Sequence, residues 1–310
     1  MTFRRKKVTF GSNLKNLSQR QHFFMQIITL TSDSGNKDHY VASVKGTIIS
    51  LFSAATIIDI THEIRPFDIA QAAHQLRNCF DDFPLGTVHV IGVDAEPQVT
   101  PGADEGSFPS ILKFNGQFIV SNDNGLFGAF LNENHPEEFY RVESILEQGK
   151  HYTFPTKQLL IPIACKILNG DNLKSFAVAR TKYKKAFTHS VVIEKNVIKG
   201  YVIHIDAFGN LITNIQRFQF ERYDKEVPYT IYFRNKEYFI EQVSPGYNAV
   251  PPGEKVAIFN SNNYLEIAIN RGANASNGGA EQLFGVRVGD MIRVEFTPRG
   301  SHDNFDTLFS

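Results

Sequence analysis

The sequence predicts a two-domain protein, with an N-terminal α/β domain built on a mainly parallel sheet and an all-β, barrel-like C-terminal domain. In the first half, short apolar strands alternate with helical patterns, whereas after about residue 189 short strands follow one another with only turn residues between them. A chain of 310 residues is long enough for two ordinary domains. We place the α/β domain at 25–185 and the β domain at 189–310.

The first 24 residues, MTFRRKKVTFGSNLKNLSQRQHFF, are basic and polar. They lack the continuous apolar segment of a secretory signal. Met25 directly precedes the first convincing strand, at 27–31. We therefore expect residues 1–24 to be either a disordered extension or a stretch upstream of a true start at Met25, and we leave them out of the fold.

Alternation of apolar strands and helical spacing defines the first domain. In chain order, we expect strand 27–31, helix 38–52, strand 56–61, helix 68–83 and strand 87–94. Next comes ILKF-NG-QFIVS, where Asn115-Gly116 between two apolar runs is typical of a β-hairpin. Two further helices are expected, one beginning at 125–131 and one at 159–168.

The second domain is predicted from closely spaced short strands, which are typical of a small barrel or sandwich. The strand segments are SVVIEKNVIKGYVIHI, YTIYFRNKEYFIEQV, KVAIFN, YLEIAI and MIRVEF. The basic stretch 180–185 lies where alternating strands and helices give way to closely spaced strands, and we interpret it as a solvated linker.

Composition excludes several classes of partner. The 32 Lys and Arg balance the 32 Asp and Glu, so no global field favours nucleic acid or an anionic membrane. No apolar run approaches the length that spans a bilayer. The two cysteines, Cys79 and Cys165, lie in apolar helical patterns, as free thiols do in a reducing compartment. We expect a cytoplasmic protein that recognises any charged ligand locally.

Motifs for other chemistries are missing from the sequence. It contains no G-x-x-x-x-G-K-[ST], no G-x-G-x-x-G after a strand and no G-x-S-x-G. The ten histidines show no H-x-H or H-E-x-x-H spacing, so we expect neither a metal site nor a resident cofactor. His62 and His89 are expected to be packed or turn histidines.

Three acidic residues stand at or near predicted strand ends: Asp33, Asp94 and Asp206. Because ligands of open α/β sheets gather outside the carboxyl ends of strands, Asp33 and Asp94 can face one crevice. The alternative for each is a helix cap or a turn residue. That alternative is strong for Asp33, since Ser34-Gly35-Asn36 is itself a turn pattern.

Three further stretches each allow two interpretations. Asn122, Asp123 and Asn124 lie in S-N-D-N-G, which is either a turn into a helix or a ring of hydrogen-bonding groups at the mouth of the sheet. The loop RGANASNGG at 271–279 is either flexible or a close approach for a flat ring. In VIHIDAFGNLITNI, a strand is interrupted either by a bulge or tight turn or for a ligand.

Five motifs in order carry a family resemblance: TLTSDSGNKDHYVASVKGTI, IIDITHEIRPFDIAQAA, FPLGTVHVIGVD, SNDNGLF and IDAFGNLITNI. Together they resemble the S-adenosyl-L-methionine hydroxide adenosyltransferase family, which is related to the fluorinase and chlorinase enzymes. The likeness runs from about Met25 to Asp290. It implies an α/β domain followed by a β-barrel domain. It also implies a homotrimer whose active sites lie between the N-terminal domain of one subunit and the C-terminal domain of the next.

The resemblance also implies a chemistry. Members bind S-adenosylmethionine (SAM) and displace methionine from C5′ of the ribose with water or a halide. A sulfonium is a good leaving group, so such an enzyme needs positioning and a dehydrated nucleophile more than strong acid catalysis. SAM is then the substrate, and no cofactor is implied.

Carried over onto this sequence, the resemblance implies that Asp33 holds the ribose hydroxyls and that Asp94 is the catalytic residue. Asp206 and Asn210 grip the ammonium and carboxylate of methionine, with Phe208 packed beside them. The loop 270–276 covers the adenine. The remaining residues expected to bind substrate are Ser34, Asn122, Asp123, Asn124, Asn270, Arg271, Asn274 and Ala275.

The sequence departs from the family where members that use water hold it with Asp, Arg and His. The segment 94–101, DAEPQVTP, keeps the Asp and has no Arg. The segment 154–158, FPTKQ, has Pro in place of the His of F-H-G-R-D and Gln in place of its Asp. His151 and Lys157 lie nearby in sequence as candidate substitutes.

The matched motifs together with the missing Arg and His leave two candidate functions. One is hydrolysis of SAM to adenosine and methionine, and the other is a non-catalytic relative that binds SAM or adenosine. No feature favours a halide-using enzyme, since the segment between Asp94 and Ser121 carries no long extra loop of the kind that fluorinases have. A different nucleophile or substrate suited to the altered pocket is a further alternative.

Overall fold

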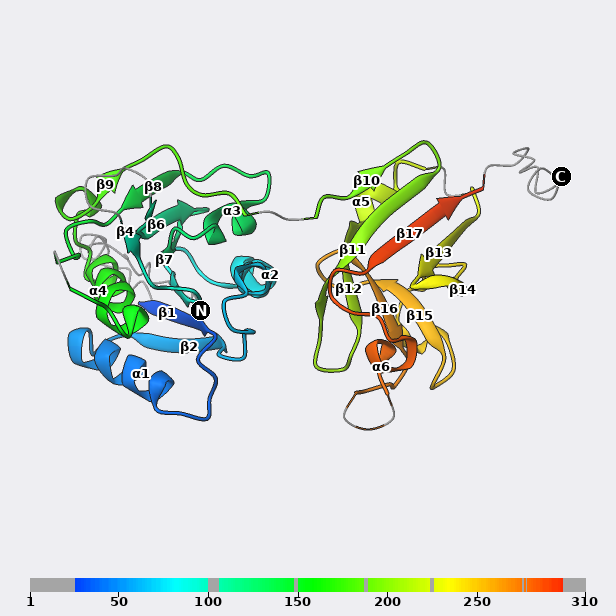
Figure 1. Ribbon diagram of the computed structural model, residues 1–310, viewed down its shortest axis with the longest axis horizontal. Helices are drawn as coiled ribbons and strands as arrows, with labels where there is room; N and C mark the ends of the chain where they lie inside the picture. The colour runs from blue at the N-terminus through cyan, green and yellow to red at the C-terminus, as the bar shows by residue number, and fades with distance from the viewer. Residues whose placement is uncertain are drawn as a thin grey trace, which may run out of the picture. The chain divides into compact units, whose positions relative to one another are not determined.

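The computed structural model describes residues 26–99, 106–147, 150–186, 189–223, 226–274, 276 and 278–297. The predicted extension at 1–24, Met25 and Ala275 lie outside these residues. The chain forms two compact units, coloured along the sequence in Figure 1. The first unit comprises residues up to Phe67 together with Asp82–Asn124 and Glu133–Tyr183, and the second comprises Asp68–Asp81, Gly125–Asn132 and residues from Lys184 onward.

A seven-stranded sheet in the order β2-β1-β3-β7-β6-β8-β9 organises the first unit. Its strands are β1 (Ile27–Ser32), β2 (Thr56–Thr61), β3 (Val88–Gly92), β6 (Pro109–Phe114), β7 (Gln117–Asn122), β8 (Glu138–Arg141) and β9 (Val178–Ala179). The first four in this order run parallel, and the remaining pairs are antiparallel. A separate two-stranded ribbon joins β4 (Gln98–Val99) to β5 (Gly106–Ser107).

Helices α1 (Tyr40–Leu51) and α4 (Ile161–Leu168) bury their apolar faces on this sheet. Val44 and Ile48 of α1 belong to the same buried cluster as strand residues such as Ile28, because they recur at helical spacing. A π-helical turn, η2 (Thr156–Leu160), leads directly into α4, and a 3-10 turn, η3 (Leu173–Ser175), follows it. The sequence predicted the helix at 159–168, but not the π-helical turn at its start.

The predicted hairpin at Asn115-Gly116 is confirmed. β6 and β7 pair antiparallel with Phe114 opposite Gln117, which leaves a two-residue loop. Both loop residues have positive φ, 46° for Asn115 and 71° for Gly116, as the favoured hairpin turn requires.

The second unit holds an eight-stranded antiparallel sheet in the order β14-β13-β17-β11-β12-β16-β15, with β10 pairing to β11. Its strands are β10 (Val192–Ile193), β11 (Val197–Ile205), β12 (Leu211–Gln216), β13 (Tyr229–Phe233), β14 (Asn235–Ile240), β15 (Lys255–Phe259), β16 (Tyr264–Ile269) and β17 (Met291–Phe296). The end strands β14 and β15 lie next to each other, so the sheet nearly closes into a barrel. The predicted barrel-like β domain is therefore confirmed.

Short helices complete the second unit: α2 (Ile69–Cys79), α3 (Leu126–Leu131), α5 (Arg217–Phe220), α6 (Ala280–Phe284) and the 3-10 turn η4 (Tyr247–Ala249). The 3-10 turn η1 (Phe80–Asp82) follows α2. Asp68 caps α2 by accepting a hydrogen bond from the Gln71 amide.

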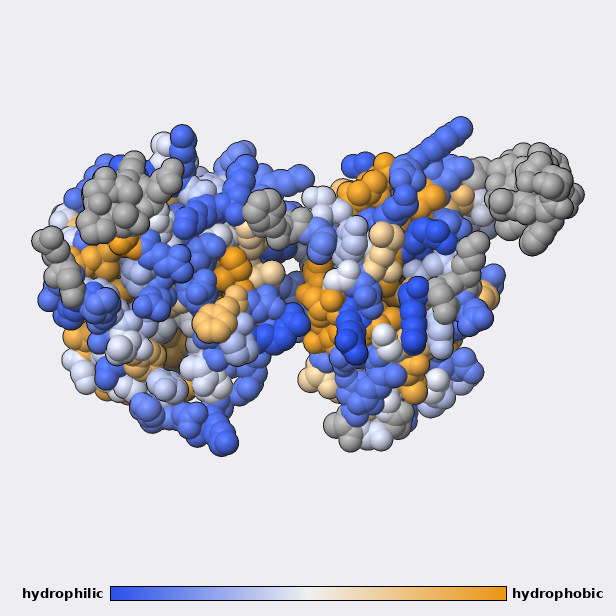
Figure 2. Space-filling view, viewed as in Figure 1, coloured by the Kyte–Doolittle hydropathy of each residue, from blue (hydrophilic) through white to orange (hydrophobic). Residues whose placement is uncertain are grey.

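Hydrophilic and hydrophobic residues are intermixed on the face of each unit shown in Figure 2. In the part of the chain that the structure describes, no helix combines the length and the apolar character needed to cross a membrane.

Candidate functional site

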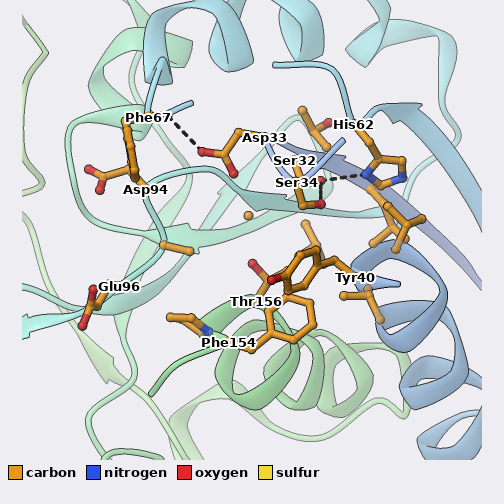
Figure 3. A pocket seen from close by; sticks show the side chains of 18 of the residues that line it. Ser32, Asp33, Ser34, Tyr40, His62, Phe67, Asp94, Glu96, Phe154 and Thr156 are labelled. Atoms are coloured by element: carbon orange, nitrogen blue, oxygen red, sulfur yellow. Dashed lines mark hydrogen bonds between the residues drawn. The ribbon is translucent and has the colours of Figure 1, made fainter. Parts of the chain in front are cut away.

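A cavity of about 370 Å³ opens in the first unit at the carboxyl ends of β1 and β3. Its walls come from the end of β1, the segment after β3, the start of η2 and one side of α1, as Figure 3 shows. This is the edge of a parallel sheet at which ligands bind in α/β folds. Asp33 and Asp94 both line the cavity, so the two carboxylates face one crevice as the sequence predicted.

The Asp33 carboxylate is fixed on one side and open on the other. Its Oδ2 accepts a hydrogen bond of 2.9 Å from the Phe67 amide, and its second oxygen lies on the cavity side in Figure 3. Phe67 has φ 65°, a conformation that costs energy for a bulky residue, and its ring is 73% exposed. The fold thus holds a carboxylate acceptor beside an exposed aromatic face, which suits a ligand that carries hydroxyls and a flat ring.

Asp94 follows β3 with φ 46°. The loop around it is held from behind by Asn124, whose Nδ2 donates to the carbonyl of Asp94 at 2.8 Å and to that of Val93 at 3.1 Å. Asn122 Nδ2 donates to the carbonyl of Glu96 at 2.9 Å. The S-N-D-N-G stretch therefore supports the segment after β3.

Asn122, Asp123 and Asn124 do not line the cavity, although all three belong to the stretch that turns into α3. Asn122 and Asp123 are buried, and the Asp123 amide donates to the carbonyl of Phe108 at 2.8 Å. Their observed contacts fit the turn interpretation. A contact with substrate stays a prediction for these residues.

The charged groups that line the cavity are all acidic. Asp33, Asp94 and Glu96 contribute carboxyls, and no Lys or Arg is found among the described lining residues. His151 and Lys157, the candidate substitutes for the family's Arg and His, do not line the cavity either. A site of this charge attracts a cation such as a sulfonium and repels an anion such as a halide.

A chain of polar side chains leads away from the cavity. Ser34 Oγ lies 2.8 Å from Ser32 Oγ, which lies 2.8 Å from His62 Nδ1 (Figure 3). The other ring nitrogen, Nε2, is 3.2 Å from Asp59 Oδ1, at the distance of an ion pair but without the geometry of a straight hydrogen bond. Asp59 Oδ2 in turn pairs with Lys45 Nζ at 2.5 Å. Burial raises the pKa of the Asp59 carboxyl, but Lys45 and His62 more than offset this, so its pKa lies below the usual value.

An apolar wall closes the far side of the cavity. Tyr40 and Phe154 pack edge to face with ring centroids 5.3 Å apart. Thr156 lies tightly against β3, since a Cβ placed on Gly92 would be 2.3 Å from Thr156 Oγ1. Glycine at this position is therefore what lets η2 approach the strand end.

In the second unit, D-A-F-G-N is the tight turn that joins β11 to β12, so it ends one strand and begins another. The Asp206 carboxylate accepts hydrogen bonds from the amides of Phe208 and Asn210, both at 2.9 Å, and from Asn210 Nδ2 at 3.0 Å. Gly209 supplies the positive φ, 82°, that the turn needs. The Phe208 ring is 61% exposed.

The C-terminal loop docks on this turn. The Asn274 amide donates to the carbonyl of Phe208 at 3.2 Å, and Asn274 Nδ2 donates to the carboxylate of Glu281. The Glu281 amide donates to the carbonyl of Gly209 at 2.9 Å. Two stretches that the sequence singled out separately are thus in direct contact.

The other predicted residues of this loop differ in their surroundings. Asn270 is buried, and its Nδ2 donates to the carbonyl of Val250 at 2.7 Å. Arg271 is exposed with φ 58°. Ala275 lies outside the described residues. The ligand roles of these three residues stay predictions.

The sequence gave no binding role to several residues that line the cavity: Ser32, Tyr40, His62, Phe67, Glu96 and Thr156. Phe67 had a signal, because a large aromatic between Pro66 and the cap of α2 is unusual at a solvated helix entrance. His89 is packed as predicted, with its ring between Thr29 Oγ1 at 2.7 Å and Gln117 Oε1 at 2.9 Å. Across the described residues, no group of three or more His, Cys, Asp or Glu is arranged to hold a metal ion.

Comparison with known proteins places this site in a family context. Models of the SAM hydroxide adenosyltransferase N-terminal and C-terminal domains match residues 28–177 and 200–293. The chain is 32% identical over 207 residues to a protein of Methanocaldococcus jannaschii named (R)-S-adenosyl-L-methionine hydrolase. The alignment covers 64% of this chain and 72% of that relative. It is 25% identical over 219 residues to a fluorinase of an Actinoplanes species, covering 63% and 74%.

A solved structure supports the same architecture. An uncharacterized conserved protein from Thermotoga maritima superposes with a TM-score of 0.74 at 29% identity, covering 86% of this chain and 99% of that protein.

Proposed function

We propose that this chain, which belongs to the SAM hydroxide adenosyltransferase family, binds SAM in the cavity of its first unit and hydrolyses it to adenosine and methionine. The observation that carries the proposal is the Asp33 carboxylate, fixed by the Phe67 amide and open toward the cavity beside the Phe67 ring. An ionised carboxylate has about four acceptor positions, so Asp33 can accept from both ribose hydroxyls and from the amide. The exposed ring of Phe67 offers an apolar face to the base.

The acidic lining supports a cationic substrate. The SAM sulfonium is positive until methionine leaves, and Asp94 and Glu96 line the cavity into which that charge is brought. In the proposed reaction a water held by Asp94 attacks C5′, the new C–O bond forms as the C–S bond breaks, and the electron pair of that bond goes to sulfur. Positioning supplies most of the rate, because the leaving group needs no protonation. The reaction as proposed requires no cofactor.

The same lining disfavours a halide as nucleophile. An anion that enters a cavity with three carboxyls and no described Lys or Arg is repelled and loses its hydration. We therefore expect no 5′-halo-5′-deoxyadenosine when the protein is incubated with SAM and chloride or fluoride.

A second candidate function is retained on a specific observation. Pro155 and Thr156 occupy the wall where the family motif places a His, and no Arg follows Asp94 in its segment. A protein without these groups can bind SAM or adenosine and not cut it. Such a binder would be stabilised by ligand, by roughly 2.7 kcal/mol at a ligand concentration a hundred times Kd.

One assay separates the two functions. Purified protein is incubated with SAM at a concentration where calorimetry shows binding, and adenosine and methionine are quantified. We expect both products in equal amounts from the wild type. We expect neither product from Asp94→Ala, although this variant should still bind SAM because the Asp33 carboxylate is unchanged. Binding without either product in the wild type would leave the binder as the function.

We further propose a homotrimer, as the resemblance implies, in which the cavity of one subunit is completed by the second unit of its neighbour. The predicted residues support this, since Asp33 and Asp94 belong to the first unit while Asp206 and Asn274 belong to the second. Sedimentation equilibrium should give three times the 35.0 kDa chain mass. The two free cysteines, Cys79 and Cys165, fit the reducing cytoplasm in which we place the protein.

A further inference from the structure

The cavity has a polar exit built from residues of two of the quoted motifs, and the resemblance assigns these residues no part in proton transfer. It runs from Ser34 through Ser32 to the ring of His62, with consecutive atoms 2.8 Å apart, and the far nitrogen of that ring faces Asp59 at 3.2 Å. Ser32, Ser34 and His62 line the cavity, whereas Asp59 does not. Asp59 is 37% exposed in its side chain, so the chain of groups connects the cavity with the surface.

Hydrolysis of SAM produces a proton that such an exit can carry. Water and the sulfonium give adenosine, methionine and one proton, and that proton must leave the oxygen that bonds to C5′. The described charged groups around the cavity are carboxylates, and that of Asp33 already accepts from the Phe67 amide. His62 is the described histidine of the lining, and an imidazole can accept a proton at one ring nitrogen and give one up at the other.

We propose that Ser34, Ser32, His62 and Asp59 form a proton relay that carries the proton of the attacking water out of the cavity; this rests on the proposed hydrolysis. As the water oxygen bonds to C5′, its proton passes to Ser34 Oγ. The hydroxyl proton of Ser34 passes to Ser32, and that of Ser32 passes to His62 Nδ1. The resulting imidazolium is balanced by Asp59, and its Nε2 proton passes to the Asp59 carboxylate, which releases it to solvent.

The electrostatic surroundings agree with this direction. An ionised Asp59 favours the ring tautomer with hydrogen on Nε2, which leaves Nδ1 free to accept from Ser32. Lys45 on α1 keeps Asp59 ionised from the other side. On the cavity side, the other titratable groups of the described lining are Asp33, Tyr40, Asp94 and Glu96. Glu63, the residue after His62, accepts a hydrogen bond of 2.9 Å from Asn36 Nδ2. His62 thus acts through Ser32 and Ser34 as a positioning residue and does not touch the substrate.

A second buried histidine gives a matched control. His89 lies in the same sheet, on β3, and its Nδ1 is 2.7 Å from the hydroxyl of Thr29. Its Nε2 faces the amide of Gln117 instead of a carboxylate, and it does not line the cavity. His62→Gln and His89→Gln therefore make the same change, to a side chain that can hydrogen-bond but cannot carry a proton.

The test measures kcat, KM and the pH dependence of kcat for the full-length protein with SAM. For His62→Gln we expect kcat to fall roughly 100-fold while KM stays within about twofold, and the acidic limb of the profile between about pH 5 and 8 to vanish. His89→Gln should keep both kcat and the limb. Asp59→Asn should move the limb to lower pH, because loss of the carboxylate makes the imidazolium less stable.

A His62→Gln protein with wild-type kcat and an intact acidic limb would overturn the relay and leave the hydrolase function standing. If His62→Gln fails to fold, Asp59→Asn on the surface decides instead, and an unmoved limb in that variant overturns the relay. A wild-type protein that binds SAM and releases no adenosine would show that the proposed function is wrong, and the relay with it.

Discussion

Two aspartates that look alike in the sequence behave differently in the two units. Asp33 at the end of β1 accepts one backbone hydrogen bond and faces a cavity, whereas Asp206 at the end of β11 accepts three hydrogen bonds inside its own turn. Both follow an apolar strand and precede a glycine within three residues. A carboxylate has about four acceptor positions, so Asp33 keeps most of its capacity for a ligand while Asp206 keeps little.

A carboxylate at a strand end can therefore position a ligand, a turn, or both. Asp206 shapes the surface to which Asn274 and Glu281 attach the C-terminal loop. Asp33 is attached to Phe67, whose side chain remains exposed. Substitutions at these two aspartates therefore separate effects on ligand binding from effects on folding.

Asp33→Ala should weaken the binding of SAM more than any other substitution considered. Two charged hydrogen bonds to ribose hydroxyls are lost, each worth about 1.5–3 kcal/mol, so Kd for SAM should rise on the order of 1,000-fold. The free energy of unfolding should change little, because only the bond from the Phe67 amide is lost. Isothermal titration calorimetry and urea denaturation measure the two quantities. Asp171→Ala, away from the cavity, is the control, and an affinity equal to that of the control would contradict the assignment.

Low pH should destabilise both units through their buried histidines. Burial lowers the pKa of His89 to about 4, and burial together with His204 and Arg77 lowers the pKa of His74 to about 3. Each ring stays neutral in the folded protein, whereas in the unfolded chain it binds a proton once the pH falls below about 6.5. The free energy of unfolding therefore decreases as the pH falls from about 6.5 toward these two values. For His89 the full loss is about 3 kcal/mol. Unfolding free energies at pH 7 and 4.5 should differ less in His89→Gln than in the wild type; an equal difference would contradict this account.

Asp206→Ala should lower the free energy of unfolding by about 2 kcal/mol, because two backbone amides and the Asn210 side chain lose their acceptor. If the carboxylate also holds the methionine ammonium, as the resemblance implies, SAM affinity falls sharply as well. Denaturation and calorimetry on the same variant separate the two roles. Unchanged affinity would make Asp206 a residue of the turn alone, and unchanged stability would contradict the hydrogen bonding described for that turn.

Asn124→Ala should have the smallest effect on stability, about 1 kcal/mol, through loss of its bonds to the carbonyls of Val93 and Asp94. Because these bonds hold the segment that carries Asp94, we expect kcat to fall roughly tenfold with little change in KM. Asn169→Ala, whose side chain bonds Asp171 at the end of α4, is the control for kinetics. Equal kcat in the two variants would show that the support of Asp94 does not matter for turnover.

Much of the fold could be predicted from the sequence because it rests on local patterns. The alternation of apolar strands and helical spacing predicted the first sheet, closely spaced short strands predicted the second, and Asn115-Gly116 predicted the hairpin. The crevice with Asp33 and Asp94 followed from the rule about strand ends.

The rest depends on contacts between distant residues. A tight turn at D-A-F-G-N was one of the two interpretations that the sequence left open, and the hydrogen bonds to Asp206 show this turn. The docking of Asn274 on it joins segments that are far apart in the chain. His62 in T-H-E was predicted to be packed or in a turn; it is buried, but it also contacts Ser32 at the cavity wall. Phe67 combines a positive φ with an exposed side chain, and residue propensities predict neither.

The central claim is that the cavity of the first unit holds the nucleoside part of SAM. A crystal structure of the protein with SAM or adenosine bound tests it most directly. We expect both ribose hydroxyls within hydrogen-bond distance of the Asp33 carboxylate, the adenine against the Phe67 ring, and C5′ facing Asp94. A ligand bound elsewhere, or one whose ribose does not contact Asp33, would contradict the account.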